Sequence, residues 1–514
     1  MAGFGAIALI FALAGAIRLW DLPLAPFHND EGVNGWFTSQ LLRTGTWAYD
    51  PANYHGPTLF YAAALSALLV GLGDFSMRLV PAAFGLATLG LVLLAGRWIG
   101  RGGSLAAAAL LAVSPGMVFF SRYAIHEMLL VFFTLAFVLA AARWWETGRV
   151  RLLLAAAAAL AAMFATKETT IITVVVLGLA VVCLFLYERL APRIPGRKGR
   201  PAWPDPSARP AASVPAGARP GRRRRVDHLA RFGGRDRLGT SLAAAGMVFA
   251  AVWVTLFSSL FTNLPSGIVD SLRSLAIWTE TARAAHVSPP LTYVGWMVEE
   301  ELPLLLAGLG GAAFVAWEGR SRFAVFVAAW ATGLLLAYSL IGYKTPWLML
   351  NWLLPFALVA GYALDRVWEA RRPLVRVGAA AGLAAALALS FVQAVQLAFR
   401  DYDAEENAYV HAQTQRDALD LVAWLRAEDD RRGTGGQLGI VLMTPDYWPL
   451  PWYLRDNTKA GFYAQVVDVA APVQIVREDQ LASLPAGFAD RYREEARYTL
   501  RPGVELVVFV ERGP

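Results

Sequence analysis

The chain has 514 residues, of which 57% are hydrophobic and 17% charged, with a mean hydropathy of +0.45 and a formal net charge of +7. A soluble globular protein carries roughly 45–50% apolar and about 25% charged residues. The apolar content excludes a disordered chain, and the single cysteine, Cys183, excludes a disulfide framework and a cysteine-built zinc site. The composition therefore predicts a polytopic membrane protein that is unusually basic.

About eleven apolar runs approach the length of roughly 20 residues that a membrane-spanning helix needs. One further run, 58–73, is short and follows the turn-like sequence His55-Gly56-Pro57, so we interpret it as a re-entrant or interfacial helix. Together they predict a mainly α-helical membrane fold with about eleven to thirteen transmembrane helices. The eleven runs cover residues 3–20, 79–96, 104–120, 128–142, 152–166, 169–187, 240–261, 302–317, 323–342, 347–364 and 375–398.

The basic residues orient these spans, because cytoplasmic loops carry an excess of Lys and Arg. With a cytoplasmic N-terminus and a run 58–73 that does not cross, arginine-bearing loops alternate with acidic ones. Residues 188–238 hold fourteen Lys and Arg against four Asp and Glu, and this surplus of ten exceeds the whole net charge. The basic charge is therefore interpreted as a topology signal at the lipid surface and not as a nucleic-acid site.

The composition changes after residue 400, where the chain becomes charged and net acidic. Helical periodicity over 415–430 and buried-strand patterns at 437–443 and 504–510 predict a small α/β domain. An odd number of spans places this domain outside the cell membrane. The predicted regions are the membrane modules 1–190 and 239–399, the first extracytoplasmic loop 21–78, a disordered cytoplasmic linker 191–238 and the extracytoplasmic domain 400–514.

Five polar motifs fall on the predicted extracytoplasmic side, although the orientation was deduced from the arginine loops. Ionisable residues at the membrane edge are costly and indicate function by default. Two of the four lysines, Lys167 and Lys344, are in these motifs, where an ammonium group suits a phosphate. A histidine beside carboxylates suits a divalent metal or proton transfer. The motifs are His-Asn-Asp-Glu (28–31), Tyr-His-Gly-Pro (54–57), Ser-Arg-Tyr-Ala-Ile-His-Glu (121–127), Thr-Lys-Glu-Thr (166–169) and Gly-Tyr-Lys-Thr-Pro-Trp (342–347).

Each motif also has a purely structural interpretation. The acidic pair 30–31 would cap the helix that follows, the pair 126–127 would be a simple loop pair, and the pair 167–168 would be a structural ion pair. Lys344 would anchor the interface beside an aromatic belt. The joint pattern favours a site in which an aspartate takes a proton from an acceptor while a cation or metal stabilises a leaving phosphate.

In this order the motifs resemble the GT-C superfamily of integral membrane glycosyltransferases, near the protein O-mannosyltransferases and lipid A aminoarabinose transferases. More narrowly, the chain looks like the flippase-activity-associated proteins of archaeal-type N-glycosylation. The broader resemblance rests on residues 27–31, 55–61, 78–81 and 121–127, and the narrower one on residues 166–169, 343–347 and 446–453. In the last segment, core packing is favoured over sugar stacking for Trp448, Trp452 and Tyr453.

The resemblance implies an inverting transfer of a sugar from a polyprenyl-phosphate donor to a lipid, glycan or protein acceptor; the alternative is a non-catalytic flippase or flippase accessory protein. By carry-over, Asp30 is the general base, Glu31 its supporting neighbour and Glu127 the second catalytic carboxylate. The implied substrate-binding residues are His55, Arg122, Tyr123, Lys167, Glu168, Tyr343 and Lys344, and the implied ligands of a divalent metal cofactor are Asp30, His55, His126 and Glu127.

The sequence departs from the family pattern at two positions. Glu127 stands where the mannosyltransferases typically have Asp, and Gly56 stands where the aminoarabinose transferases have Lys before the proline. We therefore expect Lys167 or Lys344 to supply the positive charge that the donor phosphate needs.

Overall fold

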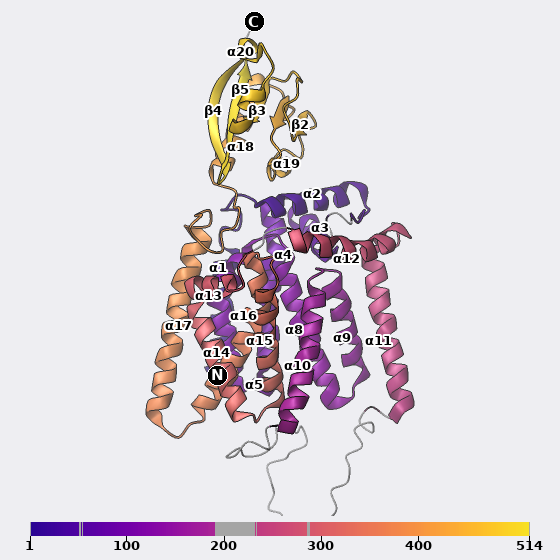
Figure 1. Cartoon of the computed structure of the whole chain (residues 1–514), viewed down its shortest axis with the longest axis vertical. Coiled ribbons are helices and arrows are strands. Elements are labelled where there is room, and N and C mark those ends of the chain that lie inside the picture. The colour runs from indigo at the N-terminus through magenta and orange to yellow at the C-terminus, as the bar shows by residue number, and fades with distance from the viewer. Residues whose placement is uncertain are drawn as a thin grey trace, which may run out of the picture.

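The computed structural model describes residues 2–50, 53, 55–190, 232, 234–284 and 288–512. Its helices stand side by side in one bundle, and a small sheet domain formed by the C-terminal residues lies on one end of that bundle (Figure 1). The predicted mainly helical membrane fold with a small α/β domain is confirmed. Of the predicted linker 191–238, only residues 232 and 234–238 are among the described residues.

Most residues of every predicted apolar run lie in helices. Within the described residues, seven helices are long and apolar enough to cross a membrane, or nine if each of two bent helix pairs is one span. The predicted minimum of eleven is reached only if two shorter apolar helices, α1 and α9, also cross. The helices are α1 (Ala2–Leu19), α4 (Asp74–Leu94), α6 (Arg101–Val113), α8 (Glu127–Thr147), α9 (Val150–Phe164), α10 (Thr170–Leu190), α11 (Gly234–Phe257), α14 (Leu302–Glu318), α15 (Arg322–Leu340), η5 with α16 (Pro346–Met349, Leu350–Trp368) and α17 (Pro373–Phe399).

The predicted span 104–120 is not one continuous helix, because the helix breaks at Ser114-Pro115. Proline lacks a backbone N–H and disfavours the helical conformation in the residue before it. Ser114 is accordingly extended, with φ −58° and ψ 126°. The short helices α7 (Pro115–Phe119) and η2 (Phe120–Arg122) then leave the axis of α6 at 66°. The bend carries the polar motif 121–127 across the end of the bundle.

The run 58–73 forms α3 (Thr58–Val70), a helix of 13 residues. At 1.5 Å per residue it is about 20 Å long, which is too short for a hydrocarbon core of about 30 Å. Its length therefore supports the interpretation that it does not cross. Two helices that the sequence analysis did not predict, α2 (Asn29–Thr44) and α12 (Ser266–Ala284), lie across the end of the bundle beneath the C-terminal domain (Figure 1).

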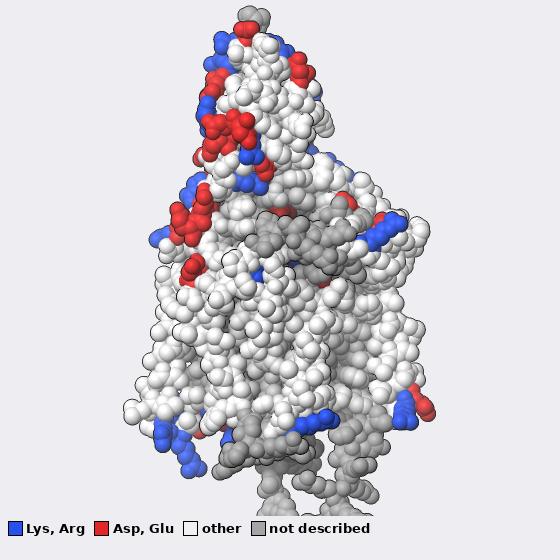
Figure 2. All heavy atoms as spheres, in the orientation of Figure 1, with Lys and Arg blue, Asp and Glu red and all other residues white. Residues whose placement is uncertain are grey.

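A broad uncharged surface covers the helix bundle between two charged ends (Figure 2). The C-terminal domain and its mixed charges lie at one end. Helix α10 ends and α11 begins at the opposite end (Figure 1). This distribution is that of a multi-pass membrane protein, because charged side chains avoid the hydrocarbon region.

The C-terminal domain packs one long helix, α18 (Asp417–Arg432), against a five-stranded sheet of order β2-β1-β3-β5-β4. β1 is parallel to β2 and β3, whereas β5 is antiparallel to β3 and β4. Leu421 and Leu425 of the helix join Leu442, Ile475 and Leu506 in the core. The remaining elements are β1 (Ile440–Met443), α19 (Leu450–Tyr453), β2 (Ala460–Tyr463), β3 (Val473–Arg477), η6 (Glu478–Ser483), α20 (Phe488–Arg491), β4 (Tyr492–Arg501) and β5 (Val504–Glu511).

The aromatic segment 448–453 fixes this domain to the membrane module. Trp452 is fully buried, its ring stacks on Phe27 at 5.2 Å, and its Nε1 donates to Oδ1 of Asp74 at 2.8 Å. The core-packing interpretation of Trp452 is therefore confirmed. The segment lies directly on α2, because a Cβ atom at Gly32 would be 2.6 Å from Cβ of Pro449, and one at Gly35 would be 2.6 Å from the Trp452 ring.

We expect Gly35→Ala to destabilise this contact. Alanine would gain up to about 1 kcal/mol of helix propensity, but overpacking a rigid ring costs about 1–3 kcal/mol. Thermal unfolding in detergent and limited proteolysis should show a lower midpoint and an earlier release of the C-terminal domain. Gly15→Ala is the matched control, since a Cβ atom at Gly15 of α1 meets no atom within 4 Å. Equal stability of the two variants would contradict the docking model.

Candidate active site

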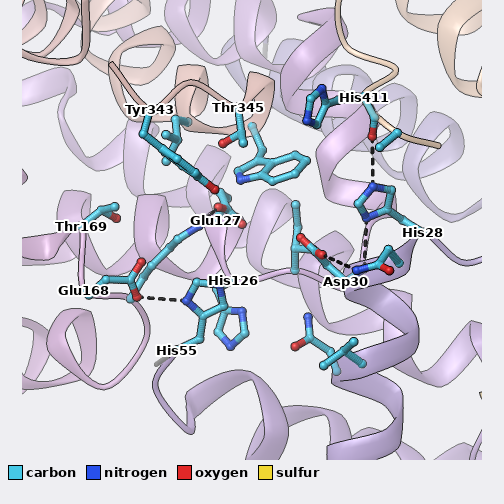
Figure 3. A pocket seen from close by; sticks show the side chains of 18 of the residues that line it. His28, Asp30, His55, His126, Glu127, Glu168, Thr169, Tyr343, Thr345 and His411 are labelled. Carbon is cyan, nitrogen blue, oxygen red and sulfur yellow. Dashed lines mark hydrogen bonds and ion pairs between the residues drawn. The ribbon is translucent and has the colours of Figure 1, made fainter. Parts of the chain in front are cut away.

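A cavity of about 470 Å³ lies where the end of the bundle meets the C-terminal domain. All five polar motifs of the sequence contribute to its wall, from the start of α2, the His55 segment, the turn before α8, the α9–α10 turn and the turn after α15 (Figure 3). The predicted site residues that line it are Asp30, His55, His126, Glu127, Lys167, Glu168 and Tyr343. The structure thus brings together residues from positions 30 to 343.

Asp30 lies in the first turn of α2 but does not cap that helix. The side chain of His28 accepts the hydrogen bond from the backbone N–H of Asp30 at 3.2 Å, and Glu31 accepts the N–H of His28 at 3.0 Å. These two residues form the capping box, so the carboxylate of Asp30 is left facing the cavity. Among the described residues it accepts only from the side-chain amide of Asn29, at 3.2 Å, and forms no ion pair.

The surroundings of Asp30 keep its carboxyl ionised. Burial raises the pKa of this group, but the nearby His28, the hydrogen bond from Asn29 and the charges of His55 and Lys167 together lower the pKa below its ordinary value. Asp30 is therefore a carboxylate throughout the neutral pH range.

The other two carboxylates of the cavity are each paired with a base. The ammonium group of Lys167 contacts Glu127, and both side chains are almost fully buried. Nδ1 of His55 lies 3.0 Å from Oε2 of Glu168 (Figure 3). Lys167 and Glu168 therefore do not pair with each other, as the structural interpretation of this motif expected. Each pairs with a residue from a distant segment of the chain. Of the three lining carboxylates, Asp30 is the one not bound to a basic side chain within the described residues.

Gly56 explains how His55 reaches Glu168. A Cβ atom at Gly56 would lie 2.0 Å from the carbonyl oxygen of Ala165, so no larger residue fits there. The backbone N–H of Gly56 donates to the carbonyl of Thr166 at 3.1 Å. The glycine at this departure from the family pattern therefore lets the His55 segment pack directly against the α9–α10 turn.

His126 is buried in the cavity wall, and its ring lies 4.8 Å from that of His55. Burial lowers the pKa of His126 well below its usual range, with the charges of His55 and Lys167 acting in the same direction. Its Nε2 has no hydrogen-bond partner among the described residues. A polar group of a bound substrate would satisfy this atom.

All four predicted metal ligands, Asp30, His55, His126 and Glu127, line the cavity. Within the described part of the chain, no three His, Cys, Asp or Glu side chains come together closely enough to hold an ion. Lys167 occupies the carboxylate of Glu127, and His55 faces Glu168. The set of Asp30, His55, His126 and Glu127 as ligands of a divalent metal stays a prediction.

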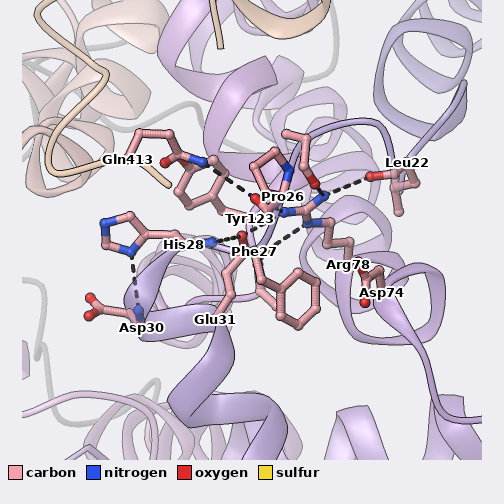
Figure 4. Close-up of polar contacts among 12 residues, drawn as sticks. Leu22, Pro26, Phe27, His28, Asp30, Glu31, Asp74, Arg78, Tyr123 and Gln413 are labelled. Atoms are coloured by element: carbon pink, nitrogen blue, oxygen red, sulfur yellow. Dashed lines mark hydrogen bonds and ion pairs between the residues drawn. The ribbon is translucent and has the colours of Figure 1, made fainter. Parts of the chain in front are cut away.

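Glu31, the predicted supporting neighbour of Asp30, does not line the cavity and forms a buried ion pair with Arg78 (Figure 4). Nε and Nη2 of Arg78 donate to the two Glu31 oxygens at 2.7 Å each. Arg78 also donates to the carbonyls of Leu22, Ala25 and Pro26, at 3.0, 2.8 and 3.1 Å. This network holds the backbone that leads into Asp30.

Three of the predicted substrate-binding residues, Lys344, Arg122 and Tyr123, also lie outside the cavity wall. Lys344 donates to the carbonyls of Tyr338, Ser339 and Ile341, at 2.7–3.1 Å, and so caps the end of α15. Arg122 donates to carbonyls at the end of α1. Helix C-termini attract cations because their last carbonyls are unpaired. The hydroxyl of Tyr123 donates to the side chain of Gln413.

The cavity also has polar residues that the sequence analysis did not propose. Asn34 follows Asp30 by one turn of α2, a spacing that could have revealed it. His411 lies in the segment before α18, and Arg501 ends β4 of the C-terminal domain. No local sequence pattern marks either residue. Nε2 of His28 donates to the carbonyl of His411 at 3.0 Å. The added lining residues with polar groups are His28, Asn29, Asn34, Asn53, Thr169, Tyr338, Thr345, Trp347, His411 and Arg501.

Comparisons with known proteins show what the chain is similar to. A model of the dolichyl-phosphate-mannose-protein mannosyltransferase family matches residues 54–194. A comparison with the curated proteins found no match. The helical bundle with its small sheet domain has an ArnT-like GT-C fold, so the fold implied by the sequence resemblance is confirmed.

Within that class, the structure is similar to ArnT from Cupriavidus metallidurans bound to undecaprenyl phosphate, with a TM-score of 0.66 and 16% identity over 99% of both chains. Its apo state matches with a TM-score of 0.64 and 15% identity over 100% of both chains. An oligosaccharyltransferase from Archaeoglobus fulgidus matches with a TM-score of 0.51 and 12% identity, over 92% of this chain and 68% of the other. At these identities, the similarity establishes the fold.

Proposed function

We propose that the protein is an integral membrane glycosyltransferase that moves a sugar from a polyprenyl-phosphate donor to an extracytoplasmic acceptor, with inversion at the sugar carbon. The observation that carries this proposal is the state of Asp30. Among the described residues it is a carboxylate that forms no ion pair, in a cavity whose other two carboxylates are paired. The GT-C fold and the family match over residues 54–194 support the same reaction class.

In the proposed reaction, the carboxylate of Asp30 takes the proton of the acceptor hydroxyl or amine. The freed electron pair attacks the anomeric carbon, and the bond from that carbon to the phosphate oxygen breaks. The electron pair of the broken bond stays on the departing polyprenyl phosphate. The pairs Lys167–Glu127 and His55–Glu168 shape the opposite part of the wall, and each is fixed before substrate arrives.

A second hollow supports a lipid-linked donor. It has a volume of about 260 Å³, and Glu168 lines both this hollow and the polar cavity. Its other lining residues are mainly aromatic and aliphatic, from α9, α11 and α12: Phe164, Phe249, Trp253, Phe257 and Leu272, with Tyr49, Ser271 and Ser274 beside them. An apolar hollow next to a polar one suits a polyprenyl chain attached to a phosphate sugar.

The test is reconstitution of the full chain in lipid vesicles with a radiolabelled polyprenyl-phosphate sugar. A transferase releases the polyprenyl phosphate and passes the label to an acceptor in a membrane extract. A flippase or flippase accessory protein would instead change the leaflet of the labelled lipid and leave the sugar bond intact. The second result would refute the proposed function.

The proposed orientation places the cavity and the C-terminal domain outside the cytoplasmic membrane, with the N-terminus inside. We expect single cysteines at the exposed Thr44 and Thr458 to react with an impermeant thiol reagent in intact cells. A cysteine at the exposed Arg320, in a basic loop, should react only after permeabilisation. The exposed Cys183 is replaced by serine in all three variants. Labelling of position 320 from outside would reverse the assignment.

A further inference from the structure

The cavity contains one cation that is supplied by the C-terminal domain. Arg501 is the last residue of β4, and it lines the cavity together with Asp30 and the two paired carboxylates. Its Nη2 donates to the carbonyl of Trp448, which starts the segment docked on α2. Its Nε is buried and has no hydrogen-bond partner among the described residues. The guanidinium is thus held in place with donor capacity to spare.

The other cations near the cavity are already engaged. Lys167 contacts Glu127, Lys344 caps α15, and Arg122 caps α1. Arg78 is bound to Glu31 and to three carbonyls. The charged lining residues are three carboxylates and two cations, Lys167 and Arg501. Because Lys167 is committed to Glu127, Arg501 is the positive charge left for an anionic substrate group.

Arg501 reaches the cavity only because the C-terminal domain is docked. The segment that accepts its hydrogen bond lies on Gly32 and Gly35 of α2, the same helix that carries Asp30 in its first turn. One rigid contact therefore sets the position of both Asp30 and Arg501. A guanidinium presents several N–H groups in a plane, which matches the oxygens of a phosphate.

We propose that Arg501 binds a phosphate group of a substrate in this cavity, so that the C-terminal domain completes the substrate site. The proposal rests on the proposed function and deepens it, because a phosphate is the group that leaves the donor. The phosphate can belong to the polyprenyl-phosphate lipid or to a soluble or acceptor molecule. The chemistry of recognition is the same for both.

The test measures binding, not turnover, on the full chain in nanodiscs with two probes, undecaprenyl phosphate and inorganic phosphate. We expect Arg501→Gln to weaken the binding of undecaprenyl phosphate at least tenfold, since a charge-assisted contact is lost. Arg501→Lys should lose less affinity than Arg501→Gln, because it keeps the charge but not the planar set of donors. Arg497→Gln is the matched control on the same strand, where the arginine is exposed and pairs with Glu494 and Glu478.

Each outcome decides the proposal. Weaker binding of both probes in Arg501→Gln, with an unchanged thermal midpoint and rescue by lysine, supports a site for the lipid phosphate. Weaker binding of inorganic phosphate alone supports a site for a soluble or acceptor phosphate. Unchanged binding of both probes, or equal losses in Arg501→Gln and Arg501→Lys, would overturn the proposal. A wild-type chain that binds through Arg501 but transfers no sugar would refute only the proposed function.

Discussion

Asp30→Asn should abolish sugar transfer while leaving donor binding intact. The amide has the shape of the carboxylate but cannot take a proton, and loss of a general base typically costs 10²–10⁴-fold in rate. The cap of α2 is made by His28 and Glu31, so the fold should not change. The measurement is the turnover rate in reconstituted vesicles, together with the affinity for undecaprenyl phosphate.

The pH dependence provides a second check on Asp30. Because the pKa of its carboxyl lies below the ordinary value of about 4, the wild-type rate should show no loss from protonation of Asp30 between pH 8 and pH 5.

The matched control for Asp30→Asn is Asp21→Asn. Asp21 is exposed at the end of α1 with φ 42°, a conformation that asparagine also tolerates. Transfer at the wild-type rate in Asp30→Asn would remove Asp30 from the mechanism.

Glu31→Ala should destabilise the protein more than any exposed substitution in the first loop. It leaves the guanidinium of Arg78 buried without its anionic partner, and breaking a buried pair costs about 3–5 kcal/mol. It also removes the acceptor of the N–H groups of His28 and Ala124, at 3.0 and 2.8 Å. The turn that presents Asp30 should loosen, so activity should fall together with the thermal midpoint.

The matched control for Glu31→Ala is Arg43→Ala. Arg43 and Asp456 form an exposed pair at 3.5 Å, and such pairs contribute about 0–1 kcal/mol. Thermal unfolding in detergent compares the two variants with the wild type. If Glu31→Ala lost transfer at full thermal stability, Glu31 would act in the chemistry and the structural assignment would be wrong.

One physical cause explains why several predicted site residues lie outside the cavity wall. The sequence predicts Glu31, Arg122 and Lys344 as site residues, and none of the three lies in the cavity wall. In the folded chain each of them has a structural partner. Glu31 pairs with the buried Arg78, and Arg122 and Lys344 donate hydrogen bonds to the last carbonyls of α1 and α15. Sequence spacing shows that a charge is present at the edge, but it does not show which partner satisfies it.

The sequence by itself determined the membrane class, the helical runs and the set of five polar motifs. These properties depend on local apolar length and on charge placement, which neighbouring residues alone express. The tertiary structure decided which members of the motifs share a cavity, because pairing joins positions more than a hundred residues apart, as between His55 and Glu168. It also decided that Arg501 joins them, since this residue reaches the cavity only through the docking of Trp452 on α2. The basic residues of the chain indicate its predicted cytoplasmic side. The proposed chemistry depends instead on two charged groups of the cavity, Asp30 and Arg501.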